Sequence, residues 1–177
     1  NCFYVVQILF VDTFLLKQYT TSSACSKQRG PIHHMTDAAI TIVGLGPGSI
    51  DDLTLEARRV LTRAASAGQT IYFRTTIHPT VEAFKHDTPD VRIESFDRLY
   101  DESENWTTLY QQIAEELCEL ATQRPIIYAV PGHPLIGEIS VQLVLKRARE
   151  RKLSTRIVSG LSFIEPVCTL LELDPFN

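Results

Sequence analysis

The segment that most constrains this chain is Ile40–Ser49, an apolar run of β-forming residues that ends in a glycine-rich loop. The loop carries glycines at 44, 46 and 48 and a proline at 47, and the amphipathic segment Leu53–Ala67 follows it. A strand, a glycine loop and a helix in this order form the first unit of an open α/β sheet, where ligands bind beyond the carboxyl ends of strands. The loop is therefore predicted to bind a ligand, with a plain connecting turn as the alternative.

The same loop is a poor match to a dinucleotide-binding fingerprint. The pattern G-x-G-x-x-G requires a glycine where Ser49 stands, and it places the start of the helix directly after the second glycine. Pro47 has no amide to donate to a pyrophosphate, and its ring fixes φ. We therefore interpret the loop as a rigid shelf rather than as an anion-binding nest.

Strand-like and helix-like segments alternate from Met35 onward, which predicts a doubly wound parallel α/β sheet. Ser49 and Asp52 have the spacing of a helix capping box. The predicted strands are Ala39–Val43, Thr70–Arg74, Val91–Ser95, Ile126–Val130 and Arg156–Ser159. The predicted helices are Leu53–Ala67, a short one after Pro79, one marked by apolar residues from Trp106 to Ala121, Ile136–Arg151, and a last one opened by residues 160–162 and ending near Leu171.

Three glycine- or proline-bearing loops follow strands in this scheme, at residues 44–49, 131–137 and 159–163. Because the carboxyl ends of parallel strands lie at one edge of a sheet, these loops are expected to converge and to form the wall of one pocket.

Three motifs identify a resemblance to the tetrapyrrole (corrin/porphyrin) methylase family. They are residues 44–48 (GLGPG) with Leu53 and Thr54, residues 129–135 (AVPGHPL), and residues 158–163 (VSGLSF). The middle motif has G-H-P where G-D-P is usual, which is similar to the methylase-like domain at the N-terminus of MazG-type and YabN-like proteins. The resemblance covers the chain from about Ala39 to its end and implies the N-terminal α/β domain of that fold, residues 35–158, with residues 159–177 as the start of a second α/β domain.

The resemblance implies a methyltransferase that binds S-adenosylmethionine (SAM) between two domains. A sulfonium methyl group is already activated, so the protein chiefly aligns it for displacement. Two roles for His133 stay open on equal terms: a hydrogen bond to the cofactor, or a cap for the helix that follows it. By motif position, the expected cofactor-binding residues are Gly46, Pro47, Gly48, Pro131, Gly132, His133, Ile136, Ser162 and Phe163.

The chain departs from the family pattern at the end of the second strand. Uroporphyrinogen methyltransferases carry an aspartate there, whereas this chain has Phe73, so no residue is assigned a catalytic role. Arg74 could bind a carboxylate of the substrate; a solvated residue at the end of the strand is the alternative. Residues 115–119 (EELCE) match only the first half of the MazG magnesium pattern, so we expect no metal site.

Composition excludes some partners. Asp and Glu outnumber Lys and Arg by 21 to 17, which argues against nucleic acid. The four cysteines have no C-x-x-C spacing, which favours a reducing cytoplasm. Residues 1–34 hold an apolar stretch too short for a membrane span and precede Met35, the only methionine, so we interpret them as a non-native or disordered leader.

The sequence thus predicts a SAM-dependent methyltransferase-like domain that acts on a small-molecule methyl acceptor. A second copy of the chain and a fused MazG-type nucleotide pyrophosphohydrolase domain are the protein partners left open. Two other functions are retained. One is an NADP-binding Rossmann oxidoreductase, and the other is a non-catalytic ligand-binding or regulatory module.

Overall fold

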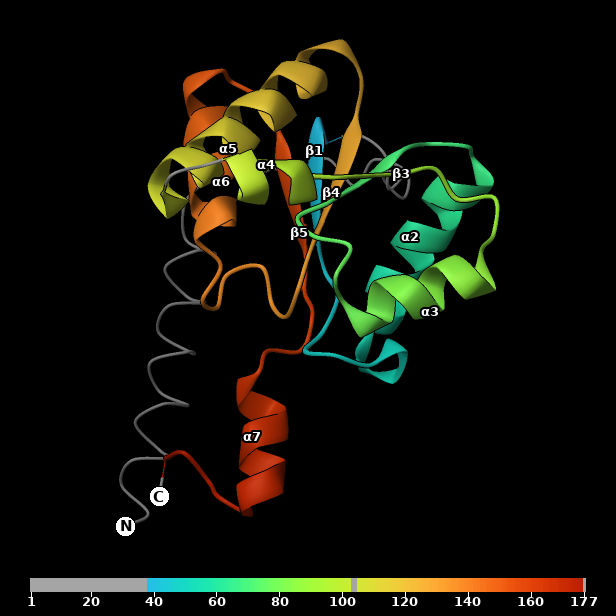
Figure 1. The fold of residues 1–177 in the computed structure, drawn as a ribbon, viewed down its shortest axis with the longest axis vertical. Helices are drawn as coiled ribbons and strands as arrows, with labels where there is room; N and C mark the ends of the chain where they lie inside the picture. The colour runs from blue at the N-terminus through green and yellow to red at the C-terminus, as the bar shows by residue number, and fades with distance from the viewer. Residues whose placement is uncertain (1–37, 103–104, 177) are drawn as a thin grey trace, which may run out of the picture. The chain divides into compact units, whose positions relative to one another are not determined.

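The computed structural model describes residues 38–102 and 105–176 (Figure 1). The interpretation of residues 1–34 as a leader concerns residues outside this part of the chain. The described strands are β1 (Ile40–Gly44), β2 (Ile71–Phe73), β3 (Ile93–Ser95), β4 (Ile126–Val130) and β5 (Thr155–Val158). The helices are the 3-10 helix η1 (Ile50–Asp52), α2 (Leu55–Ser66), α3 (Pro79–Asp87), α4 (Asp97–Glu102), α5 (Trp106–Gln123), α6 (Ile139–Glu150) and α7 (Ile164–Leu171).

The five strands form one parallel sheet in the order β3-β2-β4-β1-β5. The register aligns Ile40 with Ile126 on one side of β1 and with Thr155 on the other. The predicted doubly wound α/β fold is therefore confirmed. Because β4, β1 and β5 are neighbours, the three loops that follow them leave the sheet side by side.

The central strands are buried on both faces, which explains their continuous apolar sequences. All residues of β1, β2 and β4 are buried. Ile42 and Tyr128 point into a core formed with α5 and α6, whereas Val43 and Phe73 point into a core formed with α2 and α3. Figure 1 shows these two pairs of helices on opposite sides of the sheet.

Local capping interactions place several helix starts differently from the prediction. Ser49 and Asp52 form the expected capping box, but it caps η1. The helix α2 begins two residues later than predicted, with the Thr54 hydroxyl accepting a hydrogen bond from the Ala57 amide at 3.1 Å. Similarly, α6 begins at Ile139 because Glu138, rather than a residue near 136, caps it.

Two helices differ from the sequence analysis in what they bury. The prediction did not include α4. Leu99 of this helix is buried in the same hydrophobic core as Tyr128. In α7, none of residues 164–171 is buried, and the exposed fraction of the Leu170 side chain is 82%. Among the described residues, no helix has the length and apolar character needed to cross a membrane.

Candidate functional site

Three glycines hold the loops after β1, β4 and β5 in backbone contact. A Cβ atom built on Gly44 would lie 2.6 Å from both the Gly132 carbonyl oxygen and the Gly160 nitrogen. A Cβ atom on Gly160 would lie 2.9 Å from the Gly44 Cα atom and closer still to the Gly132 oxygen. Real Cβ atoms do not approach backbone so closely, so only glycine permits this arrangement. The predicted convergence of the three loops is present in the structure.

The first two loops are also joined by hydrogen bonds. The Gly132 amide donates to the Gly46 carbonyl at 2.8 Å, and the Gly46 amide donates to the Gly132 carbonyl at 3.3 Å. Both glycines have positive φ, +75° for Gly46 and +65° for Gly132, a region that side chains other than glycine rarely adopt. Pro47, Gly48 and Pro131 flank this pair and are partly buried.

His133 and Ile136 lie in the second loop. The Leu135 amide donates to His133 Nδ1 at 3.1 Å, so Nδ1 is an acceptor and Nε2 carries the proton in the neutral ring. This bond closes the turn after the G-H-P sequence, and Glu138 rather than His133 caps α6. The capping role considered for His133 is therefore wrong. The exposed fraction of Ile136 is 38%, which leaves its side chain accessible.

Ser162 and Phe163 follow β5 and form the start of α7. Ser162 is buried, its hydroxyl donates to Glu165, and it accepts from the Ile164 amide at 3.1 Å. The pKa of Glu165 is lowered, chiefly by the hydrogen bond from the Ser162 hydroxyl and by backbone hydrogen bonds, with a smaller contribution from His133. Burial acts in the opposite direction and raises this pKa slightly. Phe163 lies 3.7 Å from where a Cβ on Gly137 would be, which joins the third loop to the second.

Arg74 follows β2, directly beside the loop after β4. Its amide donates to the Ala129 carbonyl at 2.9 Å, and its Nε lies 3.3 Å from Glu138 Oε2. The exposed fractions of the Arg74 and Glu138 side chains are 22% and 7%, so this ion pair is largely withdrawn from water. Burial lowers the pKa of Arg74. The negative charge of Glu138 and the nearby tyrosines together raise this pKa by more than burial lowers it, so the net shift is upward. Arg74 is therefore not a solvated residue at the end of a strand.

Glu138 connects Arg74 to a buried chain of hydroxyl groups. Its Oε1 accepts from the Ser140 hydroxyl at 2.7 Å, and that hydroxyl lies 2.8 Å from the Tyr128 hydroxyl. Arg74 Nη1 donates to the Tyr100 hydroxyl at 3.3 Å. Burial raises the pKa of Tyr100 to about 12, so its hydroxyl stays protonated at neutral pH. The network gives the guanidinium a fixed position at the carboxyl edge of the sheet.

His78 stands beside Arg74 at the start of α3. Its Nδ1 atom is buried and has no hydrogen-bond partner among the described residues. Burial, together with the positive charge of Arg74, lowers its pKa from the ordinary value of 6.5. His78 is therefore neutral at physiological pH and adds no charge to the site.

Sequence reasoning missed several of these residues. Gly44 and Gly160 belong to the quoted motifs, but only their contact shows that they support the loops. The position of Glu138 is a usable signal in the sequence, because it directly follows the glycine of the second loop. A carboxylate buried there would be costly without a cation, which predicts a cationic partner. The tyrosines and Trp106 beside Arg74 gave no comparable signal in the sequence.

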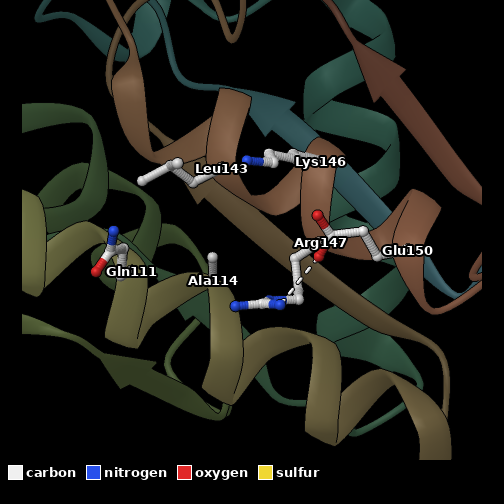
Figure 2. A pocket seen from close by; sticks show the side chains of 6 residues that line it. All are labelled: Gln111, Ala114, Leu143, Lys146, Arg147 and Glu150. Atoms are coloured by element: carbon white, nitrogen blue, oxygen red, sulfur yellow. Dashed lines mark hydrogen bonds and ion pairs between the residues drawn. The ribbon is translucent and has the colours of Figure 1, made fainter.

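Two acidic residues of α5, Glu115 and Glu116, form ion pairs with arginines. Glu115 pairs with Arg147 at 2.9 Å and also with Arg151, and Glu116 pairs with Arg98. Arg147 also pairs with Glu150, with Nη1 2.9 Å from Oε2. Figure 2 shows this pair in a groove between α5 and α6. This groove follows the two helices and lies away from the three converging loops, so we place the candidate site at the strand ends.

Comparisons with known proteins agree with this geometry. The family model for Tetrapyrrole (Corrin/Porphyrin) Methylases matches residues 39–175. The uncharacterized protein YabN of Bacillus subtilis is 36% identical over 138 residues, which cover 78% of this chain and 27% of YabN. The chain thus spans about a quarter of that relative.

Solved structures show the same fold at lower sequence identity. A diphthine synthase superposes with a TM-score of 0.59 at 20% identity, over 77% of this chain and 50% of that one. A uroporphyrin-III C-methyltransferase from Thermus thermophilus superposes with a TM-score of 0.55 at 22% identity, over 76% of this chain and 53% of that one. Together with the match of the family model over most of the chain, these findings show that the chain belongs to the tetrapyrrole (corrin/porphyrin) methylases.

Proposed function

We propose that residues 39–175 form the SAM-binding part of a SAM-dependent methyltransferase that acts on a small molecule. The observation that carries the proposal is the convergence of three loops on a glycine-only backbone contact at one edge of a parallel sheet. Such an edge is where open α/β sheets bind ligands. Membership of the methylase family adds the cofactor, since its members are methyltransferases that use SAM.

The residues proposed to contact SAM are loop residues that the structure leaves at least partly accessible. Pro47 and Gly48 follow the paired Gly46, the segment Pro131–His133 faces them across the Gly46–Gly132 bridge, and Phe163 comes from the third loop. Backbone and ring surfaces dominate this set. This suits a sulfonium ligand, whose methyl transfer needs alignment more than acid or base groups.

NADP binding is disfavoured by how the first loop uses its amides. The Gly46 amide donates to Gly132, the Ser49 amide to Asp52, and the Asp51 amide to the Ser49 hydroxyl. An anion nest needs such N–H groups directed at the phosphates. Because these amides are already paired within the protein, the loop offers a surface for packing rather than a cradle for a pyrophosphate.

We further propose that residues 159–177 begin a second domain that completes the site. The helix α7 exposes Val167, Leu170 and Leu171, with exposed fractions of 46%, 82% and 62%. An uncovered apolar surface of this kind marks a place where another structural element docks. A second α/β domain of the same protein is our first assignment, and a fused MazG-type domain is the alternative.

We also propose a cytoplasmic location. Cys118 and Cys168 form no disulfide, as is usual for proteins in the reducing cytoplasm.

The test is thermal unfolding of the full-length protein with SAM, S-adenosylhomocysteine or NADP. A ligand that binds only the folded state raises the unfolding free energy by about 2.7 kcal/mol at a hundred times its Kd. We expect stabilisation by SAM and S-adenosylhomocysteine and none by NADP. Stabilisation by NADP alone would instead support the oxidoreductase, and no response to any of the three would support a non-catalytic module.

A further inference from the structure

A cavity of about 430 Å³ lies at the end of β2, next to the second loop, and the cofactor residues do not line it. Its walls come from the segment after β2, from α4 and from the start of α5. Its lining includes Arg74, Asp97, Tyr100, Trp106 and Tyr110. Arg74 connects the cavity to the second loop through Glu138, so a molecule bound here would lie next to the proposed cofactor site.

Aromatic rings form one wall of this cavity. Trp106 stacks on Tyr110 with ring centroids 6.2 Å apart and meets Tyr100 edge-on at 5.9 Å. The exposed fraction of the Trp106 side chain is nevertheless 66%. This exposure is unusual, because indole is among the side chains that gain most from burial. Trp106 thus keeps a large exposed aromatic surface beside two tyrosines that also line the cavity, a surface suited to a planar ring.

Arg74 supplies directed donors to the same cavity. Nε faces Glu138 and Nη1 donates to Tyr100, while Nη2 has no hydrogen-bond partner among the described residues. Nε is buried, and its contact with Glu138 does not have hydrogen-bond geometry. A guanidinium has five N–H donors, so several remain for an acceptor atom in the cavity.

The cavity nevertheless has no excess of positive charge. Glu138 compensates Arg74, and Asp97 adds a carboxylate that accepts from the Thr76 amide at 2.9 Å, the Thr76 hydroxyl at 2.6 Å and the Ser95 hydroxyl at 2.9 Å. His78, a second basic group beside Arg74, is neutral. An anionic ligand would meet two carboxylates with one cation, whereas an uncharged acceptor keeps the hydrogen bonds without that repulsion.

We propose that this cavity recognises the methyl acceptor through a planar, uncharged heteroaromatic ring, which stacks on Trp106 and accepts a hydrogen bond from Arg74 through a ring carbonyl or ring nitrogen. The assignment of the ring to the methyl acceptor rests on the proposed function. Binding of the ring itself does not, so the two can fail separately.

Trp106 is the only tryptophan of the 177-residue chain, so it can report directly on the cavity. The chain is labelled with fluorotryptophan and its single fluorine NMR resonance is followed during titration. Three bicyclic probes of similar size are compared: isocarbostyril, an uncharged ring with a carbonyl; naphthoate, its carboxylate counterpart; and naphthalene, which has no acceptor. We expect isocarbostyril to shift the resonance at the lowest concentration. Tighter binding of naphthoate, equal binding of naphthalene, or no shift with any probe would overturn the proposal.

Variants test the role of the guanidinium. Arg74→Gln alone would leave Glu138 buried without its cation, so Arg74→Gln is combined with Glu138→Gln. This double variant should bind isocarbostyril about tenfold or more weakly, the size expected for losing a hydrogen bond from a charged donor. Glu138→Gln alone should shift the preference toward naphthoate, because it leaves the positive charge uncompensated.

Arg58→Gln is the matched control. It removes an exposed arginine on α2 whose Nη2 pairs with Asp87 at 3.5 Å. Neither residue lines the cavity, so this variant should bind isocarbostyril like the wild type. Unchanged binding in the double variant would exclude Arg74 as the donor and overturn the proposal. The two proposals can be distinguished. If isocarbostyril shifts the Trp106 resonance but the full-length protein does not bind SAM, the ring site is supported and the methyltransferase assignment is refuted.

Discussion

Replacement of Gly160 by alanine tests whether the three loops depend on a backbone contact that only glycine permits. The added methyl group would lie 2.8 Å from the Gly44 carbonyl carbon and 2.9 Å from its Cα, and closer still to the Gly132 oxygen. All three neighbours are backbone atoms, so no side chain can rotate away. Ordinary contact begins at 3.4 Å. The loops must therefore separate by several tenths of an ångström or more.

The cost follows from this geometry. Overpacking in a well-packed region costs typically 1–3 kcal/mol, and three backbone clashes put Gly160→Ala at about 3 kcal/mol. For a domain of this size, each kcal/mol lowers Tm by about 2–4 °C, so a decrease of about 6–12 °C is expected. SAM binding should weaken as well, because the three loops would no longer meet.

The assay is thermal unfolding followed by circular dichroism, with Gly48→Ala as the control. A methyl group at Gly48 would meet nothing within 4 Å among the described residues, and its φ is not positive. That variant should unfold at or slightly above the wild-type Tm, because alanine reduces the entropy of the unfolded chain. The reasoning is refuted if Gly160→Ala and Gly48→Ala have the same Tm.

Three further outcomes are expected. Burial and Arg74 lower the pKa of His78, so the unfolded chain binds a proton at higher pH than the folded one. Urea unfolding should therefore show wild-type stability falling between about pH 7.5 and about pH 5.5 more than that of His78→Asn, and parallel curves would contradict this. Gly132→Val should weaken SAM binding in calorimetry, because valine disfavours φ of +65°; unchanged affinity in a folded variant would place the pocket elsewhere. Leu170→Glu should change the unfolding free energy by less than about 0.5 kcal/mol and reduce any concentration-dependent association in sedimentation, and a large loss of stability would mean that Leu170 packs on the core.

Much of the fold could be predicted from the sequence because its signals are local. The run Ile126–Val130 has no charged side chain and no alternation of polar and apolar residues, as expected for a strand covered on both faces, and β4 is such a strand. The three loop motifs could be placed at strand ends for the same reason. The helix starts were less predictable, because Thr54 and Glu138 compete with nearby capping residues and the choice depends on hydrogen bonds formed in three dimensions.

The sequence by itself thus determined the alternation of strands and helices, the order of the three loops, and the family. Only the tertiary structure decided how the loops meet. It brings Gly44, Gly132 and Gly160 into contact from distant parts of the chain, and glycine content alone does not reveal which glycines touch. The same holds for Arg74 and Glu138, whose ion pair depends on β2 and β4 being neighbours in the sheet. Strand order is set by packing between distant segments, and periodicity along the chain carries no record of it.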